Sequence, residues 1–130
     1  MIILDTHVWL WFLIGSSELK KKDAELIEKN RDQVAISSIS VWEGILLAER
    51  GKLSCGKEEF IQIAKESALN LGIRDIPITS EISILSRQLK FNHKDPADRF
   101  ICATAHSLSG TLLTRDKEIL SLNWLSTRKV

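Results

Sequence analysis

Residues 1–14 read MIILDTHVWLWFLI, and this stretch indicates the class of the fold. Met1 to Leu4 is a short apolar run with two adjacent isoleucines, which is typical of a strand buried on both faces. Asp5 and Thr6 interrupt the run, and the segment from Val8 to Ile14 then has the composition of a helix. Because its apolar residues point in every direction around the axis, this helix is expected to be buried on more than one side.

The same alternation continues along the rest of the chain. Further strands are predicted at 34–36, 73–78 and 111–113, with an edge strand at 124–127, and helices at 18–30, 39–50, 57–71, 81–89, 97–108 and 116–122. Short apolar strands separated by helices indicate an α/β fold, in which a central parallel sheet is flanked by helices on both faces. Without repeats, low-complexity segments or a linker, residues 1–130 are expected to form a single domain.

The composition restricts the class of protein. Of the 130 residues, 44% are hydrophobic and 27% are charged, which supports a packed core and argues against disorder. The net charge of +1 means that a nucleic acid would have to bind through a local basic rim. Cys55 and Cys102 form no zinc-binding spacing, which favours a reduced intracellular protein. The apolar run at 8–14 is too short to span a membrane, so we expect a cytoplasmic location.

Four acids fall at strand ends or helix starts. Asp5 ends the first strand, Glu43 lies one turn into the helix after the second, Asp98 opens the helix after the loop at 92–96, and Asp116 follows the fourth strand. In an open parallel sheet, ligands bind outside the carboxyl ends of the strands. We therefore expect these acids to lie near one edge of the sheet.

Acids gathered in this way favour a metal site. Carboxylates in one pocket repel each other unless cations neutralise them. Mg²⁺ and Mn²⁺ prefer oxygen ligands. Such a site suits phosphodiester hydrolysis, since the ion activates a water molecule and stabilises charge on the phosphate oxygens.

Each acid also fits a purely structural role at a helix start. Glu43 would pair with Ser40 in an S-x-x-E capping box. Asp98 would be favoured in a first turn by the helix dipole. Spacing alone leaves both interpretations open. The positions that would cap a helix N-terminus are Asp5, Asp95 before Pro96, and Asp116.

Four stretches of the sequence resemble the PIN domains of VapC-type toxins. They are residues 3–7 (ILDTH), 36–43 (ISSISVWE), 93–99 (HKDPADR) and 113–116 (LTRD). They occur in the family's order and cover nearly the whole chain. The resemblance implies a PIN-like fold with a short central parallel sheet and an acidic pocket.

The resemblance also implies roles for individual residues. The catalytic, metal-binding acids would be Asp5, Glu43, Asp98 and Asp116, which hold Mg²⁺ or Mn²⁺ and position the attacking water. Asp95 would either support the site or only cap its helix. Independently of the resemblance, Arg99 and Arg115 each follow or precede a proposed metal-binding acid, and they would contact RNA phosphates, support the carboxylates or remain solvated surface charges. The hydroxyl positions that would orient carboxylates or waters are Thr6, Ser38 and, with a weaker match, Thr114.

The activity implied by the resemblance is that of a metal-dependent endoribonuclease, the toxin component of a type II toxin–antitoxin system. Family members often act on transfer or ribosomal RNA, and the products would carry a 5′-phosphate and a 3′-hydroxyl. The resemblance further implies a homodimer and inhibition by a VapB-like antitoxin whose C-terminal segment covers the pocket. The apolar helix that carries Trp9, Trp11 and Phe12 fits such contacts, or simple burial in the monomer core.

Three other functions compete with this one. A haloacid-dehalogenase-type phosphatase needs a second Asp two residues after the first, where this chain has His7. A receiver domain needs a Lys after a late strand, where this chain has Arg115. A catalytically silent PIN-like binding module would keep the fold without cleavage, although retention of all four acids argues against it.

Some residues near the acids carry weaker expectations. His93 and Lys94 would add to a basic rim, and His7 would either approach the pocket or form a structural hydrogen bond. Gly44 follows Glu43 within a helix, where glycine costs about 1 kcal/mol relative to alanine. This cost indicates close packing or close backbone approach at that position.

Overall fold

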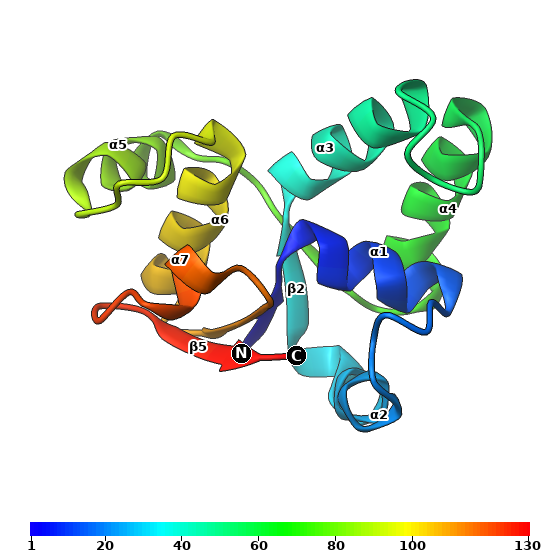
Figure 1. Ribbon diagram of the computed structural model, residues 1–130, viewed down its shortest axis with the longest axis horizontal. Coiled ribbons are helices and arrows are strands. Elements are labelled where there is room, and N and C mark those ends of the chain that lie inside the picture. Colours follow the sequence, from blue (N-terminus) through cyan, green and yellow to red (C-terminus); the bar gives the residue numbers. More distant parts are fainter.

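Five parallel strands form the central sheet of the computed structural model, which describes residues 1–130 (Figure 1). The order across the sheet is β3-β2-β1-β4-β5. The first strand lies at the centre, where Ile3 pairs with Ala35 on one side and Leu112 on the other. The strands are β1 (Ile2–Leu4), β2 (Val34–Ser37), β3 (Arg74–Ile76), β4 (Thr111–Thr114) and β5 (Ser126–Lys129).

Helices cover both faces of this sheet, as the sequence predicts. In Figure 1 the first, third and fourth helices lie on one side of the sheet and the fifth to seventh on the other. Leu4 of β1 belongs to the core on the first side, and Ile3 belongs to the core on the second. The helices are α1 (Thr6–Ile14), α2 (Lys21–Lys29), α3 (Ser38–Glu49), α4 (Lys57–Asn70), α5 (Ser80–Gln88), α6 (Pro96–Ser107) and α7 (Lys117–Leu120), with a short 3₁₀ helix at Arg31–Gln33.

The last strand differs from its predicted position. It begins at Ser126, so the prediction of a strand from 124 was wrong by two residues. Trp124 instead donates its indole N–H to the carbonyl of Lys90 at 2.8 Å and packs edge-on against His106. Trp124 has the composition typical of a strand, but it anchors the loop that precedes β5.

The helix α1 is buried as its all-round apolar composition indicates. It begins at Thr6, two residues earlier than predicted, because Asp5 caps it. Trp9 is fully buried and packs edge-on against Phe60, whereas Trp11 and Phe12 are half-buried beside the same core. None of the helices is both long enough and apolar enough to cross a membrane.

Gly44 of α3 lies where the aromatic ring of Phe60 meets the helix. A Cβ atom added to Gly44 would lie 2.3 Å from Cζ of Phe60, whose side chain is 1% exposed. The glycine is therefore explained by close packing of α4 on α3, and not by the approach of backbone to the acids.

Gly44→Ala is expected to lower the free energy of unfolding by about 1–3 kcal/mol, because overpacking a core outweighs the better helix propensity of alanine. Urea denaturation measures this change. Gly56→Ala is the matched control, since a Cβ there meets nothing within 4 Å. A Gly44→Ala protein as stable as the wild type would show that Phe60 has room to move.

Candidate metal centre

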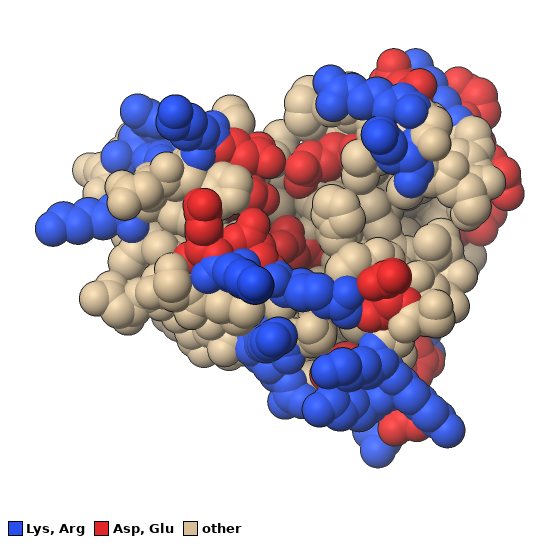
Figure 2. Space-filling model, viewed as in Figure 1, with Lys and Arg blue, Asp and Glu red and all other residues tan.

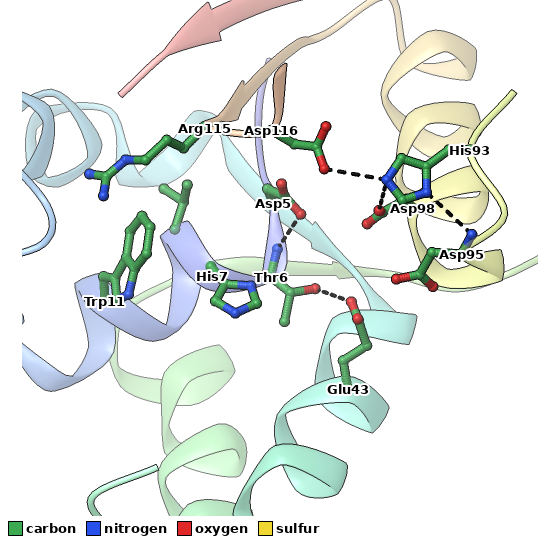
Figure 3. A pocket seen from close by; sticks show the side chains of 11 residues that line it. Asp5, Thr6, His7, Trp11, Glu43, His93, Asp95, Asp98, Arg115 and Asp116 are labelled. Carbon is green, nitrogen blue, oxygen red and sulfur yellow. Dashed lines mark hydrogen bonds and ion pairs between the residues drawn. The ribbon is translucent and has the colours of Figure 1, made fainter. Parts of the chain in front are cut away.

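The four predicted acids lie around one cavity at the carboxyl ends of β1 and β4 (Figure 3). The cavity has a volume of about 340 Å³ and only two apolar lining residues, Val8 and Trp11. Strands β1 and β4 are neighbours, which brings the residues that follow them together. The other lining residues are Asp5, Thr6, His7, Glu43, His93, Asp95, Asp98, Arg115 and Asp116.

Asp5 is held by hydrogen bonds to both carboxylate oxygens. The backbone N–H of Thr6 donates to Oδ1 at 2.8 Å, and the hydroxyl of Thr114 donates to Oδ2 at 2.6 Å. The Thr114 hydroxyl in turn accepts the backbone N–H of Asp116 at 3.1 Å. Thr114 thus orients Asp5 and links it to the backbone of a second acid.

Glu43 reaches the cavity from α3 and is held by Thr6. The Thr6 hydroxyl donates to Oε1 of Glu43 at 2.5 Å and lies 2.9 Å from Oγ of Ser40. Since Thr6 has one hydroxyl proton, Ser40 is the donor in the second contact. The hydroxyl of Thr6, which is 1% exposed, therefore fixes the direction of Glu43.

The structure corrects two expectations about the serines. Ser40 and Glu43 form no capping box, because Ser37 is the N-cap of α3 and its hydroxyl accepts the N–H of Ile39. Ser38 does not line the cavity. The serine that contacts the site is Ser40, whose hydroxyl lies 2.9 Å from that of Thr6.

Asp98 and Asp116 lie close together with a histidine between them. Nε2 of His93 is 3.1 Å from Oδ2 of Asp98 and 3.4 Å from Oδ2 of Asp116. Potential ligand atoms of these three residues all lie within 4.8 Å of one another. Asp98 comes from the first turn of α6, whose N-cap is Asp95 followed by Pro96.

Three of the acids both cap a helix and line the cavity. Oδ1 of Asp116 accepts the backbone N–H groups of Glu118 and Ile119 and caps α7, while its Oδ2 faces the cavity. Asp5 likewise caps α1 while lining the cavity. Asp95 accepts the N–H of Ala97 and also lines the cavity. A cap uses one oxygen and fixes the direction of the other.

The two arginines beside the acids have different roles. Arg99 does not line the cavity; it donates from Nη1 to the carbonyl oxygens of Phe91 and His93 and so holds the loop before α6. Arg115 lines the cavity, with its guanidinium 4.4 Å from the centre of the Trp11 ring. It also pairs with Glu18 at 2.9 Å.

Four titratable groups of the site have raised pKa values. Burial raises the pKa of Asp5 and Glu43, partly opposed by the threonine hydroxyls that bond to them. Burial, together with the charges of Asp5 and Asp95, raises the pKa of Asp98 to about 7. For His93, burial disfavours the charged form, but the surrounding acids outweigh it and raise the pKa.

This donor set fits a hard divalent cation. The four acids offer oxygen ligands, and no Lys or Arg side chain forms a salt bridge with any of them. Buried carboxylates that lack a cationic partner other than His93 are stabilised by an ion that supplies positive charge. Mg²⁺ and Mn²⁺ match such ligands.

Thr6→Val is expected to weaken the affinity for Mn²⁺ by about 10–100-fold, the usual effect of losing a partner that orients a metal ligand. The variant keeps the shape of the side chain but frees Glu43 to rotate. Titration with Mn²⁺ followed by electron paramagnetic resonance measures the change. Thr111→Val, which removes a hydroxyl contact with Ser126 away from the cavity, should bind Mn²⁺ as the wild type does.

The sequence did not indicate how close two histidines lie to the acids. His93 lies among the acids rather than on a basic rim, and His7 lines the cavity with its ring edge-on to Trp11. The signal for His7 was its position two residues after Asp5. His93 is the first residue of the 93–99 stretch, but nothing local indicates its contact with Asp116, which follows β4.

Comparison with known proteins agrees with the geometry. The family model of the PIN domain matches residues 2–125. Ribonuclease VapC22 of Mycobacterium tuberculosis is 30% identical over 123 residues, which cover 92% of this chain and 90% of that protein.

Solved structures of the same fold come from toxin–antitoxin complexes. A chain of the promoter-bound VapBC2 complex of Rickettsia felis matches with a TM-score of 0.72 at 20% identity, covering 100% of this chain and 99% of that one. A chain of DNA-bound VapBC from Salmonella typhimurium matches with a TM-score of 0.73 at 18% identity, covering 98% and 96%. The chain therefore belongs to the PIN-domain family and has the fold of its VapC-type members.

Proposed function

We propose that this protein is a metal-dependent endoribonuclease, the toxin component of a type II toxin–antitoxin pair. The observation that carries the proposal is the convergence of Asp5, Glu43, Asp98 and Asp116 on one cavity without a Lys or Arg partner. Membership of the PIN-domain family and the similarity to a VapC ribonuclease support it.

The fold holds Asp5 and Glu43 in place and leaves Asp98 open to a cation. Asp5 is fixed at both oxygens and Glu43 at one, while Asp98 has no hydrogen-bond donor other than His93. We propose that Asp5, Glu43, Asp98 and Asp116 hold Mg²⁺ or Mn²⁺. A divalent ion bound there would neutralise phosphate charge and activate a water molecule.

The distribution of charge explains why RNA would need that ion. Figure 2 shows acidic side chains gathered in the central hollow, with Lys and Arg side chains around it. A phosphodiester would be repelled by the acids alone. Arg115 lines the cavity, and the exposed Lys94 and Lys117 directly neighbour Asp95 and Asp116 in the chain, so the rim can attract the RNA backbone.

An antitoxin segment would find an apolar surface beside the acids. A cavity of about 420 Å³ shares Glu43 and Asp95 with the metal centre and includes Trp42, which is 57% exposed. The solved relatives from Rickettsia felis and Salmonella typhimurium are VapBC complexes. We therefore propose a VapB-like partner that covers both cavities. A cytoplasmic homodimer is likewise part of the proposal, and light scattering on the purified protein tests the dimer.

Incubation of antitoxin-free protein with total cellular RNA and Mn²⁺ or Mg²⁺ tests the proposed activity. We expect cleavage that stops with EDTA, and fragments that carry 5′-phosphate and 3′-hydroxyl ends and identify the target among transfer and ribosomal RNAs. Products with 2′,3′-cyclic phosphate ends would contradict a hydrolytic mechanism. No cleavage by folded, metal-loaded protein across total RNA would favour a silent binding module.

A further inference from the structure

His93 lines the acidic cavity but is not one of the four proposed metal-binding acids. It lies in the loop between α5 and α6, and its ring points into the acidic cavity (Figure 3). Nε2 lies 3.1 Å from Asp98, 3.4 Å from Asp116 and 3.7 Å from Glu118. With 20% of its side chain exposed, His93 is in contact with the acids and still open to a ligand.

Packing and hydrogen bonds hold the His93 ring and its loop in place. It packs on Phe91, which is 7% exposed, with 5.5 Å between ring centres. Arg99 donates to the carbonyl oxygens of both residues and ties the loop to α6. The position of His93 therefore belongs to the packed structure of the loop.

A hydrogen bond determines which ring nitrogen carries a proton. The backbone N–H of Asp95 donates to Nδ1 of His93 at 3.2 Å, so in the neutral ring Nδ1 is the acceptor and the proton is on Nε2, which also carries a proton in the charged ring. A histidine that binds a metal donates its other ring N–H to an acceptor, which is the reverse of this arrangement. His93 is therefore placed as a donor toward the cavity, and not as a metal ligand.

A substrate can approach this donor from two sides. A second cavity of about 550 Å³ lies beyond His93 and is lined by Lys90, Phe91, Asn92, Glu118, Ser121 and Leu122. His93 lines both cavities. An RNA chain whose phosphate is held at the acids can thus continue past the imidazole.

We propose that His93 contacts the substrate, its Nε2–H donating a hydrogen bond to a non-bridging oxygen of the RNA phosphate bound at the acids. The inference rests on the proposed function. When a cation neutralises Asp98 and Asp116, their oxygens no longer require this donor, and the incoming phosphate becomes its acceptor. His93 is thereby assigned to substrate binding in addition to the four acids.

Three variants separate this role from the alternatives. His93→Leu removes the donor, whereas His93→Gln keeps an N–H at the same distance from the backbone along the side chain. His106→Gln is the matched control, because His106 packs on Trp124 outside the cavity. We expect His93→Leu to slow RNA cleavage about 100-fold, as for the loss of a donor to a reacting oxyanion, and His93→Gln to slow it about tenfold at most.

Two binding measurements do not depend on cleavage. Manganese affinity should stay within about threefold of wild type in all three variants, since substitution of a true ligand would lower it far more. Inorganic phosphate, followed by ³¹P relaxation on the Mn²⁺-loaded protein, should bind about tenfold more weakly to His93→Leu alone.

The outcomes distinguish this inference from the proposed function. Loss of Mn²⁺ binding in His93→Leu would make His93 a ligand, and unchanged phosphate affinity in that variant would leave it only a counter-charge for the acids. Either result overturns the inference. Failure of the wild type to cleave RNA would instead count against the ribonuclease activity, while the phosphate measurement would still decide the contact.

Discussion

Asp98→Asn is expected to slow RNA cleavage by at least about 1000-fold, equivalent to about 4 kcal/mol of activation free energy. The side chain is 14% exposed, and His93 is its one side-chain partner. Its oxygens are therefore free to bind a cation, and an amide carries no charge to offer one.

The same substitution should stabilise the metal-free protein. Burial and neighbouring acids raise the pKa of Asp98 to about 7, so its charge is unfavourable in the folded state at higher pH. We expect Asp98→Asn to increase the free energy of unfolding at pH 8 in EDTA by about 1–3 kcal/mol. Urea denaturation measures this gain.

Asp32→Asn is the matched control, because Asp32 is exposed and its side chain has no hydrogen-bond or salt-bridge partner. It should leave both cleavage and stability unchanged. If Asp98→Asn unfolded the protein, the role of Asp98 in the first turn of α6 would be structural. If the variant cleaved RNA normally, Asp98 would not bind the metal.

Without metal, the protein should lose stability as the pH rises from about 4 to about 7. The folded state holds the Asp98 proton up to about pH 7, whereas the unfolded chain releases it near its ordinary value of 3.8. The raised pKa values of Asp5 and Glu43 act in the same direction. For His93, whose pKa is also raised, the stabilisation is present below 6.5 and is lost as the pH rises through the folded value.

Thermal unfolding between pH 5 and pH 8 in EDTA checks this expectation. The midpoint should decrease toward pH 8, and the decrease should be smaller in Asp98→Asn. Mn²⁺ at about 100 times its dissociation constant should restore about 2.7 kcal/mol at pH 8. A midpoint that does not change with pH, or that rises, would show that burial and neighbouring charges do not raise the pKa values of these acids in the folded protein.

Much of the fold could be predicted because its signals are local. The run at Met1–Leu4 followed by Asp5 predicts both a buried strand and a polar edge, and the structure has β1 at the centre of a parallel sheet. The prediction of a strand at 124–127 was wrong because Trp124 has strand-like composition, while its indole bonds to Lys90 from a distant loop.

The acids could be located from the sequence, but their surroundings could not. Strand ends and helix starts place Asp5 and Asp116 at one edge of the sheet, which the structure confirms. The contact of Ser40 with Thr6 and that of His93 with Asp98 depend on how separate helices pack. Spacing in the sequence could not separate helix caps from proposed metal ligands, because the same side chains serve as both. In Asp5 and in Asp116, one carboxylate oxygen caps a helix while the side chain lines the cavity.

The most direct test of a metal-dependent site is Mn²⁺ binding and RNA cleavage measured on the same samples of wild type and Asp5→Asn. Asp5 is chosen because both of its oxygens are fixed by the fold. We predict that the wild type binds Mn²⁺ and cleaves RNA in proportion to its Mn²⁺ occupancy, and that Asp5→Asn loses both activities while it remains folded. Cleavage by the wild type in EDTA, or full activity in Asp5→Asn, would contradict this prediction.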